Sequence, residues 1–335
     1  MTHSTTQLEH LLGLREEAAS YPHTLQLDLC HSVLRCLCED DATSPEEDHH
    51  HSHTTTLALH MVLDLASPLP PTCADLFLQA LCVSPQPLPF IQCAPQAFSH
   101  SDPPLRQLLL DTLQELLLYN RHLTVPVLGC LGEMQLTVEQ QRIVSRLAEE
   151  ALSTAEEEDI PVIIRVLLRS LTVENAENLV HKIRELEPQL SESGLLLCVQ
   201  VLEETFRVSS FAVRVFLKAM LSARACSVMD VFVSILLQSH SSRKERAEAC
   251  LEKAARRGAL TVDTFLNALK HEQVLRKYSP QIVQLLLQNV ASSTCVWSSW
   301  LPQCVPCLFE LYPSCRSELV SGLLFMLPNR TLPPK

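Results

Sequence analysis

The sequence predicts an all-α fold, arranged as an irregular α-solenoid of about fourteen helices. Apolar residues recur at helical spacing along most of the chain, and no series of alternating, strand-like segments is visible. Only six of the 335 residues are glycine, whereas ordinary usage is about 7%. Few positions are therefore left for tight hairpins or phosphate-binding loops, which favours helices over a nucleotide-binding α/β fold.

The clearest helix signatures follow one another closely in the stretch 123–186. Gly132 closes the first predicted helix, and Thr137 with Gln140 forms a capping box at the start of the second. Asp159 is expected to cap the third with its carboxylate, and Pro161 occupies its first turn. The apolar face of this third helix is too broad for a helix lying alone on a surface. It predicts neighbours on two sides, as in stacked helical hairpins.

Helical spacing extends this pattern along the rest of the chain. Ser209 and Thr261 are expected to be N-caps, and Gly258 a C-cap. Because no exact period is visible, the array is predicted to be degenerate and closer to HEAT-type helical pairs than to strict repeats. Helical spacing is visible in seventeen segments, thirteen of which lie within 105–327: 6–18, 24–38, 56–65, 73–82, 105–118, 124–131, 137–151, 159–171, 173–186, 194–206, 210–221, 228–237, 243–257, 262–269, 280–290, 297–311 and 314–326.

Two stretches interrupt the helical pattern. Acidic residues followed by His49, His50, His51 and His53 predict a solvated loop at 40–54. Prolines crowd the second stretch and predict an irregular connector. We therefore expect a helical segment at 1–85 containing the loop, a proline-rich connector at 86–104, an α-solenoid at 105–327 and a disordered tail at 328–335. A metal site using the histidines with Cys36 and Cys38 is a weaker alternative for the loop.

Composition excludes several classes of function. The net charge of -12 disfavours a free-standing nucleic-acid binder, although a local basic strip could still act within a larger assembly. No apolar run is long enough for a membrane span, and no signal peptide is recognisable. The cysteines are irregularly placed and are expected to be buried in a reducing compartment. No catalytic or cofactor-binding motif is present, so we expect neither an enzyme nor a bound cofactor or metal.

One helix, 243–257, is basic and is the candidate contact surface. Residues four apart share a helix face, so Lys253 and Arg257 are expected to project together. The strip would suit a phosphate backbone or an acidic partner surface. An ordinary solvated helix face is the alternative. The candidate contact residues are Lys244, Arg246, Lys253, Arg256 and Arg257.

Two further clusters have simpler interpretations. Cys304 and Cys307 have the spacing of a redox pair, and a zinc site with Cys295 and Cys315 is conceivable, but helix packing is favoured because no strand precedes them. The acidic run 156–159 could supply paired carboxylates for acid–base chemistry. Its place before a helix N-terminus favours capping and compensation of the helix dipole instead.

Several of these helices resemble consecutive helices in the N-terminal half of the Fanconi anaemia group D-2 family. The likeness covers roughly 105–323 and, more weakly, 1–85. It consists of packing and capping motifs in order, without a catalytic signature. The segments that carry it are Leu123–Leu128, Asp159–Arg165, Glu174–Leu186, Arg243–Gly258 and Thr264–Phe265.

The resemblance implies a non-catalytic scaffold that pairs with the Fanconi group I paralogue. In the family, this pair clamps duplex DNA after monoubiquitination by the Fanconi core ubiquitin ligase and supports interstrand crosslink repair in the nucleus. This chain lacks a basic N-terminal import segment and the acidic C-terminal tail, and it ends before the region of the acceptor lysine. We therefore expect an N-terminal portion or a truncated form. The alternative function is a generic HEAT-like adaptor that binds peptide motifs or protein partners.

Overall fold

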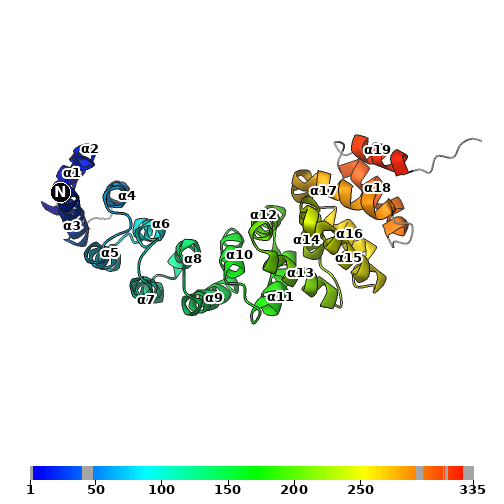
Figure 1. The fold of residues 1–335 in the computed structure, drawn as a ribbon, viewed down its shortest axis with the longest axis horizontal. Coiled ribbons are helices and arrows are strands. Elements are labelled where there is room, and N and C mark those ends of the chain that lie inside the picture. The colour runs from blue at the N-terminus through cyan, green and yellow to red at the C-terminus, as the bar shows by residue number, and fades with distance from the viewer. Residues whose placement is uncertain (1–2, 40–47, 292–296, 312, 314–315, 327–335) are drawn as a thin grey trace, which may run out of the picture. The chain divides into compact units, whose positions relative to one another are not determined.

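The computed structural model in Figure 1 describes residues 3–39, 48–291, 297–311, 313 and 316–326. These residues form 19 α-helices with short 3₁₀ turns between some of them, and none of them lies in a strand. The predicted all-α, solenoid-like fold is therefore confirmed. The chain divides into two compact units, Met1–Thr154 and Ala155–Lys335, and each is described by itself.

Unit 1 consists of two rows of helices. In one row α3, α5 and α7 pack in succession, and in the other α4, α6 and α8 do the same, with each helix of the first row against its successor in the chain. Figure 1 shows this pairing, which is the arrangement of a helical solenoid. The helices of unit 1 are α1 His3–Gly13, α2 Arg15–Ala18, α3 His23–Glu39, α4 Asp48–Leu65, α5 Pro71–Val83, α6 Leu88–Ala97, α7 Pro103–Tyr119, α8 Thr124–Glu133 and α9 Val138–Leu152.

Three phenylalanines hold the middle of unit 1 together. Phe77 lies on α5, and its ring meets Phe90 of α6 edge-on with 5.4 Å between centroids. The ring of Phe98 also meets Phe77 edge-on, with 5.6 Å between centroids. All three side chains are fully buried. Burial of aromatic rings is among the largest single contributions to a core, so this cluster fixes the α5–α6 pair.

Unit 2 repeats the two-row arrangement. One row contains α10, α12, α14 and α17, and the other contains α11, α13 and α15. The aromatic pair Phe206–Phe216, with centroids 5.3 Å apart, joins α12 to α13 across the rows. The helices of unit 2 are α10 Ile160–Arg169, α11 Ala176–Leu186, α12 Glu192–Val208, α13 Ser210–Ser222, α14 Val228–Leu236, α15 Ser241–Arg256, α16 Val262–Ala268, α17 Glu272–Ala291, α18 Trp297–Leu311 and α19 Arg316–Met326.

Most of the predicted local caps are confirmed. Thr137 and Gln140 form the reciprocal capping box of α9, with backbone-to-side-chain distances of 3.3 and 3.0 Å. The hydroxyl of Ser209 accepts from a backbone N–H at the start of α13, and that of Thr261 does the same for α16. Gly258 has a φ of 71° and follows α15, as a C-cap requires.

The acidic run before α10 acts differently from the prediction. Asp159 has helical backbone angles and makes no side-chain cap bond, so the predicted cap at this residue is wrong. Glu157 instead reaches the N-terminus of α12, where its carboxylate accepts from the N–H of Ser191 at 2.8 Å and from the Ser191 hydroxyl. The negative charge still offsets a helix dipole. The helix concerned is α12, not α10, which directly follows the acidic run.

The structure differs from the expected segmentation in three places. The stretch 86–104 is not a simple connector, because α6 occupies Leu88–Ala97 with Pro89 in its first turn, where a missing N–H does no harm. Residues 48–54, expected in the loop at 40–54, are helical because α4 begins at Asp48; residues 40–47 and the predicted tail at 328–335 lie outside the described residues. The division between units falls after Thr154 rather than at the connector. The described residues form more helices than the fourteen predicted, in part because they include short helices such as α2.

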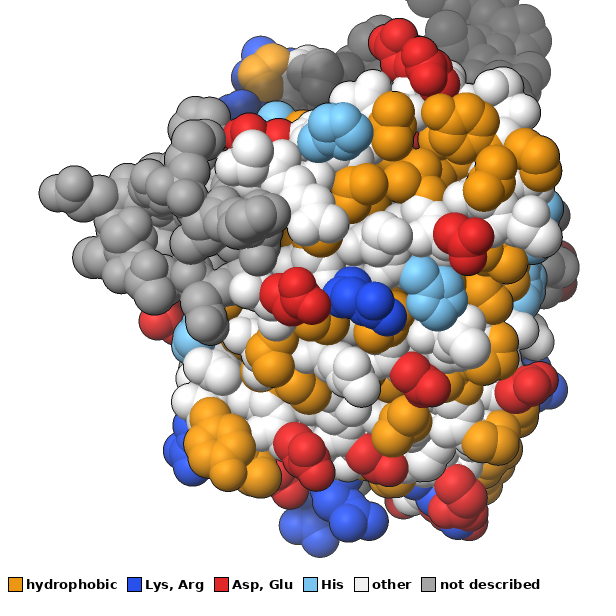
Figure 2. Space-filling model, turned by 90° about the vertical axis from the view of Figure 1, so that its left-hand side faces the viewer, with side chains coloured by type: hydrophobic (Ala, Val, Ile, Leu, Met, Phe, Trp, Pro, Cys, Tyr) orange, Lys and Arg blue, Asp and Glu red, His pale blue; other side chains and the backbone are white. Residues whose placement is uncertain are grey.

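The surface of unit 1 is mixed in character. On the face that Figure 2 shows, hydrophobic patches alternate with acidic side chains and histidines, and the Lys and Arg side chains are scattered among acidic ones. No basic strip is visible on the part of this face that described residues form. Within the described part of the chain, no helix combines the length and the apolar character needed to span a membrane.

Candidate nucleic-acid interface

The candidate contact helix, α15, is fixed by one apolar face and one polar anchor. Ala247, Leu251 and Ala254 are fully buried on the face that packs against α13 and α14. At its first turn, the guanidinium of Arg243 donates to the backbone carbonyl of Phe206, in the last turn of α12. A cation at a helix C-terminus is stabilising because it meets the negative end of the dipole.

The exposed side of α15 presents most of the predicted basic residues together. Arg246, Lys253, Arg256 and Arg257 are all exposed, and their spacing places them along one side of the helix. Lys244 is separate, because it is half-buried and lies on the face of Glu248. Burial raises the pKa of Glu248, and the charge of Lys244 opposes that rise. The structure thus brings together four of the five predicted residues.

One of these four charges is partly neutralised within the helix. Arg256 pairs with Glu252, one turn earlier, through its guanidinium. Arg246, Lys253 and Arg257 have no ion pair with any residue that the structure describes. These three side chains are the strongest candidates for a phosphate or a carboxylate supplied by a partner, because their charges are not already compensated.

The C-terminal end of α15 adjoins the loop between α13 and α14. The N–H of Cys226 in that loop donates to the carbonyl of Ala259 at 2.7 Å. Burial raises the pKa of Cys226 to about 12, while the charges of Arg184 and Arg257 act in the opposite direction. Arg257, which directly follows α15, and Arg184 of α11 therefore both lie near this loop, which itself carries the exposed Arg224. Because Arg184 is paired with Asp230, Arg224 and Arg257 supply the exposed positive charge near the loop.

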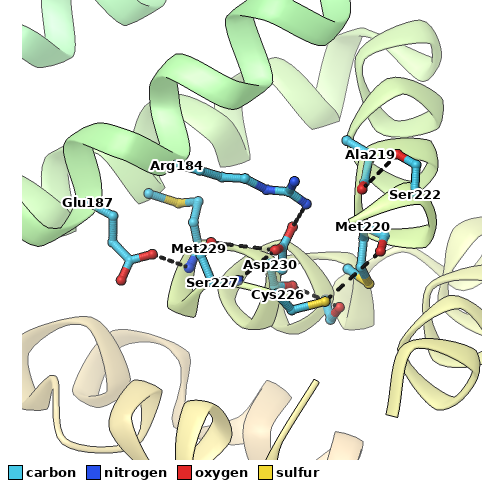
Figure 3. Close-up of polar contacts among 10 residues, drawn as sticks. Arg184, Glu187, Ala219, Met220, Ser222, Cys226, Ser227, Met229 and Asp230 are labelled. Carbon is cyan, nitrogen blue, oxygen red and sulfur yellow. Dashed lines mark hydrogen bonds and ion pairs between the residues drawn. The ribbon is translucent and has the colours of Figure 1, made fainter. Parts of the chain in front are cut away.

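A buried ion pair ties this region together, as Figure 3 shows. The guanidinium of Arg184, from α11, lies 2.5 Å from the carboxylate of Asp230, in the first turn of α14. The Arg184 side chain is 18% exposed and that of Asp230 only 3%. Asp230 also accepts from the N–H of Ser227 at 2.9 Å, and Glu187 accepts from the N–H of Met229 at 3.1 Å. Two carboxylates therefore serve the orphan donors of α14, and α11 is anchored to α14.

The cysteine pair in α18 does not have the environment of a redox site. Cys304 and Cys307 lie within one helix, and burial raises the pKa of Cys304 to about 12. Burial also raises the pKa of Cys307. A redox pair needs an accessible thiolate near neutral pH, which a raised pKa disfavours. Cys295 and Cys315, the partners considered for zinc, lie outside the described residues.

The side chains of His49, His50 and His51 in the histidine-rich stretch lie outside those that the structure describes, so a metal site there stays an untested alternative. Cys36 is buried. His53, which lies on α4, is exposed. Among the described residues, no group of three or more His, Cys, Asp and Glu side chains is arranged to hold a metal ion.

Sequence reasoning missed three arginines that shape this surface. None of the three is among the predicted contact residues, although Arg184 lies in the predicted helix 173–186, Arg224 in the connection after 210–221, and Arg243 at the start of the basic helix. The partners of Arg184 and Arg243 are 46 and 37 residues away in the chain. No local pattern encodes contacts of that separation. The local signal is position alone: Arg184 lies in the last turn of α11 and Arg243 near the start of α15, where a long side chain can reach a neighbouring helix.

The fold and this surface define an all-α, solenoid-like protein with a basic helix face in its second unit. Residues 106–214 match the family model described as "Fanconi anaemia protein FancD2 nuclease". The match runs from α7 to α13 and so ends before α15.

A curated relative carries the same family name. The Fanconi anemia group D2 protein of Gallus gallus is 23% identical over an alignment that covers 74% of this chain and 20% of the chicken protein. The resemblance predicted from the sequence is confirmed, since both comparisons find the chain similar to FancD2. It spans about a fifth of the length of that relative.

Proposed function

We propose that this chain acts in the nucleus as a non-catalytic scaffold of the Fanconi anaemia pathway of DNA interstrand crosslink repair. In this role it pairs with the Fanconi group I paralogue, and the pair clamps DNA; the Fanconi core ubiquitin ligase is a further partner in the full-length family. The observation that carries the proposal is the match of residues 106–214 to the FancD2 family model. The likeness to the chicken group D2 protein extends it over 74% of the chain.

The proposed DNA contact is the exposed side of α15. Arg246, Lys253, Arg256 and Arg257 lie along it, and lysine and arginine are the side chains that most often contact the phosphate backbone. Because the chain as a whole is strongly acidic, we expect weak binding by the chain alone and tighter binding by the pair.

Association with the paralogue is the first test. The purified chain and the purified group I paralogue are mixed and analysed by pull-down and by size-exclusion chromatography with light scattering. We expect a stable one-to-one complex. Its absence at micromolar concentrations would count against the repair role and in favour of the generic HEAT-like adaptor. Incubation of the complex with duplex DNA and Mg²⁺ should leave the DNA uncut, which tests the non-catalytic assignment.

Charge reversal on α15 provides the second test. Replacement of Lys253, Arg256 and Arg257 by glutamate should weaken DNA binding by the complex and lower the magnitude of the slope of log K against log salt by about 2 to 3, because each lost phosphate contact removes about one. Binding is measured by fluorescence anisotropy at several salt concentrations.

A matched pair of single substitutions controls for net charge. Lys253→Glu should lower the slope by about 1. Lys270→Glu makes the same change of charge at an exposed residue after α16 and should leave the slope unchanged. Equal slopes for all variants and the wild type would remove α15 from the interface.

A further inference from the structure

A groove of about 360 Å³ lies between α11 and α13 in unit 2. Phe211, Val215 and Ala219 line one side, and they follow at intervals of four residues on α13, so they form one continuous stripe. All three are partly exposed. Val173 lines the groove from the segment before α11 and is 81% exposed. Apolar side chains therefore remain in contact with water along a helical stripe, although neighbouring stripes of the same helices are buried.

The rim of this groove is positively charged. Arg214 and Lys218 stand on α13, one turn apart, and Arg184 lines the groove from α11. The guanidinium of Arg214 lies 6.0 Å from the centre of the Phe211 ring, so the charge is held over the apolar stripe. Glu177 is the single acidic residue among those that line the groove. In a chain with a net charge of -12, this is a local reversal of sign.

The carboxylate of Glu177 already pairs with one of the basic side chains of the rim. The carboxylate of Glu177 on α11 and the ammonium of Lys218 on α13 are 3.0 Å apart, so the pair spans the groove. Their side chains are 82% and 76% exposed. Ion pairs with this exposure contribute little to stability, so the pair can open without disturbing the helices. A carboxylate from another molecule could therefore replace that of Glu177.

Deeper contacts keep the groove in shape. Figure 3 shows Arg184 extending from α11 to Asp230 on α14, and Ser222 at the end of α13 with its hydroxyl bonded to the Ala219 carbonyl. Both Arg184 and Ser222 line the groove. The largely buried Arg184–Asp230 pair holds α11, one wall of the groove, in place, so a ligand need not order that wall on binding, which favours affinity.

We propose that the groove between α11 and α13 docks an acidic, amphipathic helical segment of a partner protein. Its apolar side chains would cover Val173 and the stripe of Phe211, Val215 and Ala219, and its carboxylates would pair with Arg214 and Lys218. This is the helix-in-groove mode of recognition, in which a stripe at helical spacing meets a complementary stripe. The inference does not depend on DNA binding or on pairing with the paralogue.

An acidic segment fits this groove better than a nucleic acid does. A phosphate backbone would satisfy Arg214 and Lys218 but would leave the apolar stripe and Val173 uncovered. Protein recognition sites typically combine a central apolar area with a polar rim, as this groove does. The charged rim would set the orientation and the choice of partner, and the apolar stripe would supply most of the contact area.

The test uses the full chain and a synthetic probe. The probe is a fluorescein-labelled helical peptide of about 14 residues, about 21 Å long, which is close to the length of α13. It carries leucine along one face and glutamate along both flanks of that face. A matched peptide carries lysine in place of every glutamate. Binding to the wild type and to three variants is measured by fluorescence anisotropy, and circular dichroism verifies that each variant is folded.

We expect saturable binding of the glutamate peptide and not of the lysine peptide. Lys218→Glu should weaken binding by at least about tenfold, because it adds repulsion as well as removing a pair. Glu177→Gln should strengthen binding roughly two- to fivefold, the range that exposed ion pairs span, since it removes the internal competitor. Lys270→Glu, outside the groove, should have no effect.

Three results would overturn the proposal. The first is equal binding of both peptides to the wild type, and the second is unchanged binding of the glutamate peptide to Lys218→Glu. The third is displacement of the peptide by duplex DNA, together with weaker binding of that DNA to Lys218→Glu. The last result would make the groove a phosphate site. Because Glu177 and Lys218 are exposed, both variants should fold, so loss of binding cannot be attributed to unfolding.

Discussion

At the scale of single residues, Glu248 is a titratable group whose burial lowers the stability of unit 2 when it is ionised. It lies on α15, and one carboxylate oxygen is buried with no hydrogen-bond partner among the described residues. Burial raises its pKa above the ordinary 4.5, Lys244 lowers it and Glu245 raises it further. A raised pKa in the folded state means that the folded protein binds this proton more tightly than the unfolded chain does. Ionisation of Glu248 therefore reduces stability as pH rises above 4.5.

The variant Glu248→Gln tests this effect. The amide keeps the shape of the side chain but cannot ionise, so the variant should be more stable than the wild type at pH 7. Its advantage should shrink as pH falls toward 4.5, where the wild-type carboxyl gains its proton. Urea unfolding at a series of pH values measures the difference. Glu158, an exposed glutamate of unit 2 that does not act on Glu248, provides the control, because Glu158→Gln should shift stability little at any pH. A constant difference for Glu248→Gln across the series would contradict the assignment.

Residues whose partners lie within one helical turn could be predicted from the sequence, and residues with distant partners could not. Thr137 and Gln140 are three positions apart, and Gly258 needs only its own backbone conformation. Glu157 caps a helix through Ser191, 34 positions away. The choice between Asp159 and Glu157 depends on where α12 packs, which local spacing does not encode. Capping was the correct role for the acidic run, but both the residue and the helix differ.

At the scale of elements, α6 shows the limit of reading proline as a breaker. Its segment contains Pro89 in the first turn and Pro95 in the interior, and the helix continues through both. Phe90 and Ile91 are fully buried there, and Phe90 packs against Phe77. Tertiary burial of these side chains outweighs the helix-breaking tendency of the prolines, because most helical stability in proteins comes from packing.

The candidate surface on α15 was predictable in part for a physical reason. Spacing along one helix places Arg246, Lys253 and Arg257 on one exposed side, since a helix has a fixed period. The same reasoning could not identify which neighbours cover the other faces. The burial of Lys244 and the contribution of Arg184 from α11 depend on packing between rows.

The contact between α11 and α14 should depend strongly on one ion pair. Removing Arg184 by an Arg184→Met substitution leaves Asp230 buried without its countercharge, and should cost about 3 to 5 kcal/mol. Asp230→Asn keeps an acceptor for the N–H of Ser227 but removes the charge. In the double variant neither charge is left alone, so its loss of stability should be smaller than the sum of the two single losses. The free energies of unfolding of the four proteins, measured in urea, complete the cycle.

The exposed pair Lys218–Glu177 provides the contrast for this cycle. It also joins two helices, but both side chains are mostly in water. Its coupling energy should be no more than about 1 kcal/mol. Similar coupling for the two pairs would mean that burial does not decide their strength.

At the scale of the whole molecule, the chain consists of two units with separate aromatic cores. Phe77, Phe90 and Phe98 belong to unit 1, and Phe206 and Phe216 to unit 2. In a solenoid each helical pair contacts only its neighbours, so stability is expected to be local. The sequence could predict stacked pairs from broad apolar faces. It could not place the division after Thr154, because no composition change marks that position and the proline-rich stretch suggested another.

If stability is local, a substitution in the core of one unit should destabilise that unit and leave the other unchanged. Phe77→Ala removes a fully buried ring and should cost about 3 to 5 kcal/mol. If the units are energetically separate, amide hydrogen exchange measured by mass spectrometry should accelerate in α3 to α8 and remain at wild-type rates in α10 to α15. The reciprocal variant, Phe216→Ala, should accelerate exchange in α11 to α15 and leave α3 to α8 unchanged. Acceleration of both sets by either substitution would mean that the units unfold as one. In that case damage in unit 1 would also weaken the basic face of α15 and the groove between α11 and α13, although every contact residue remained in place.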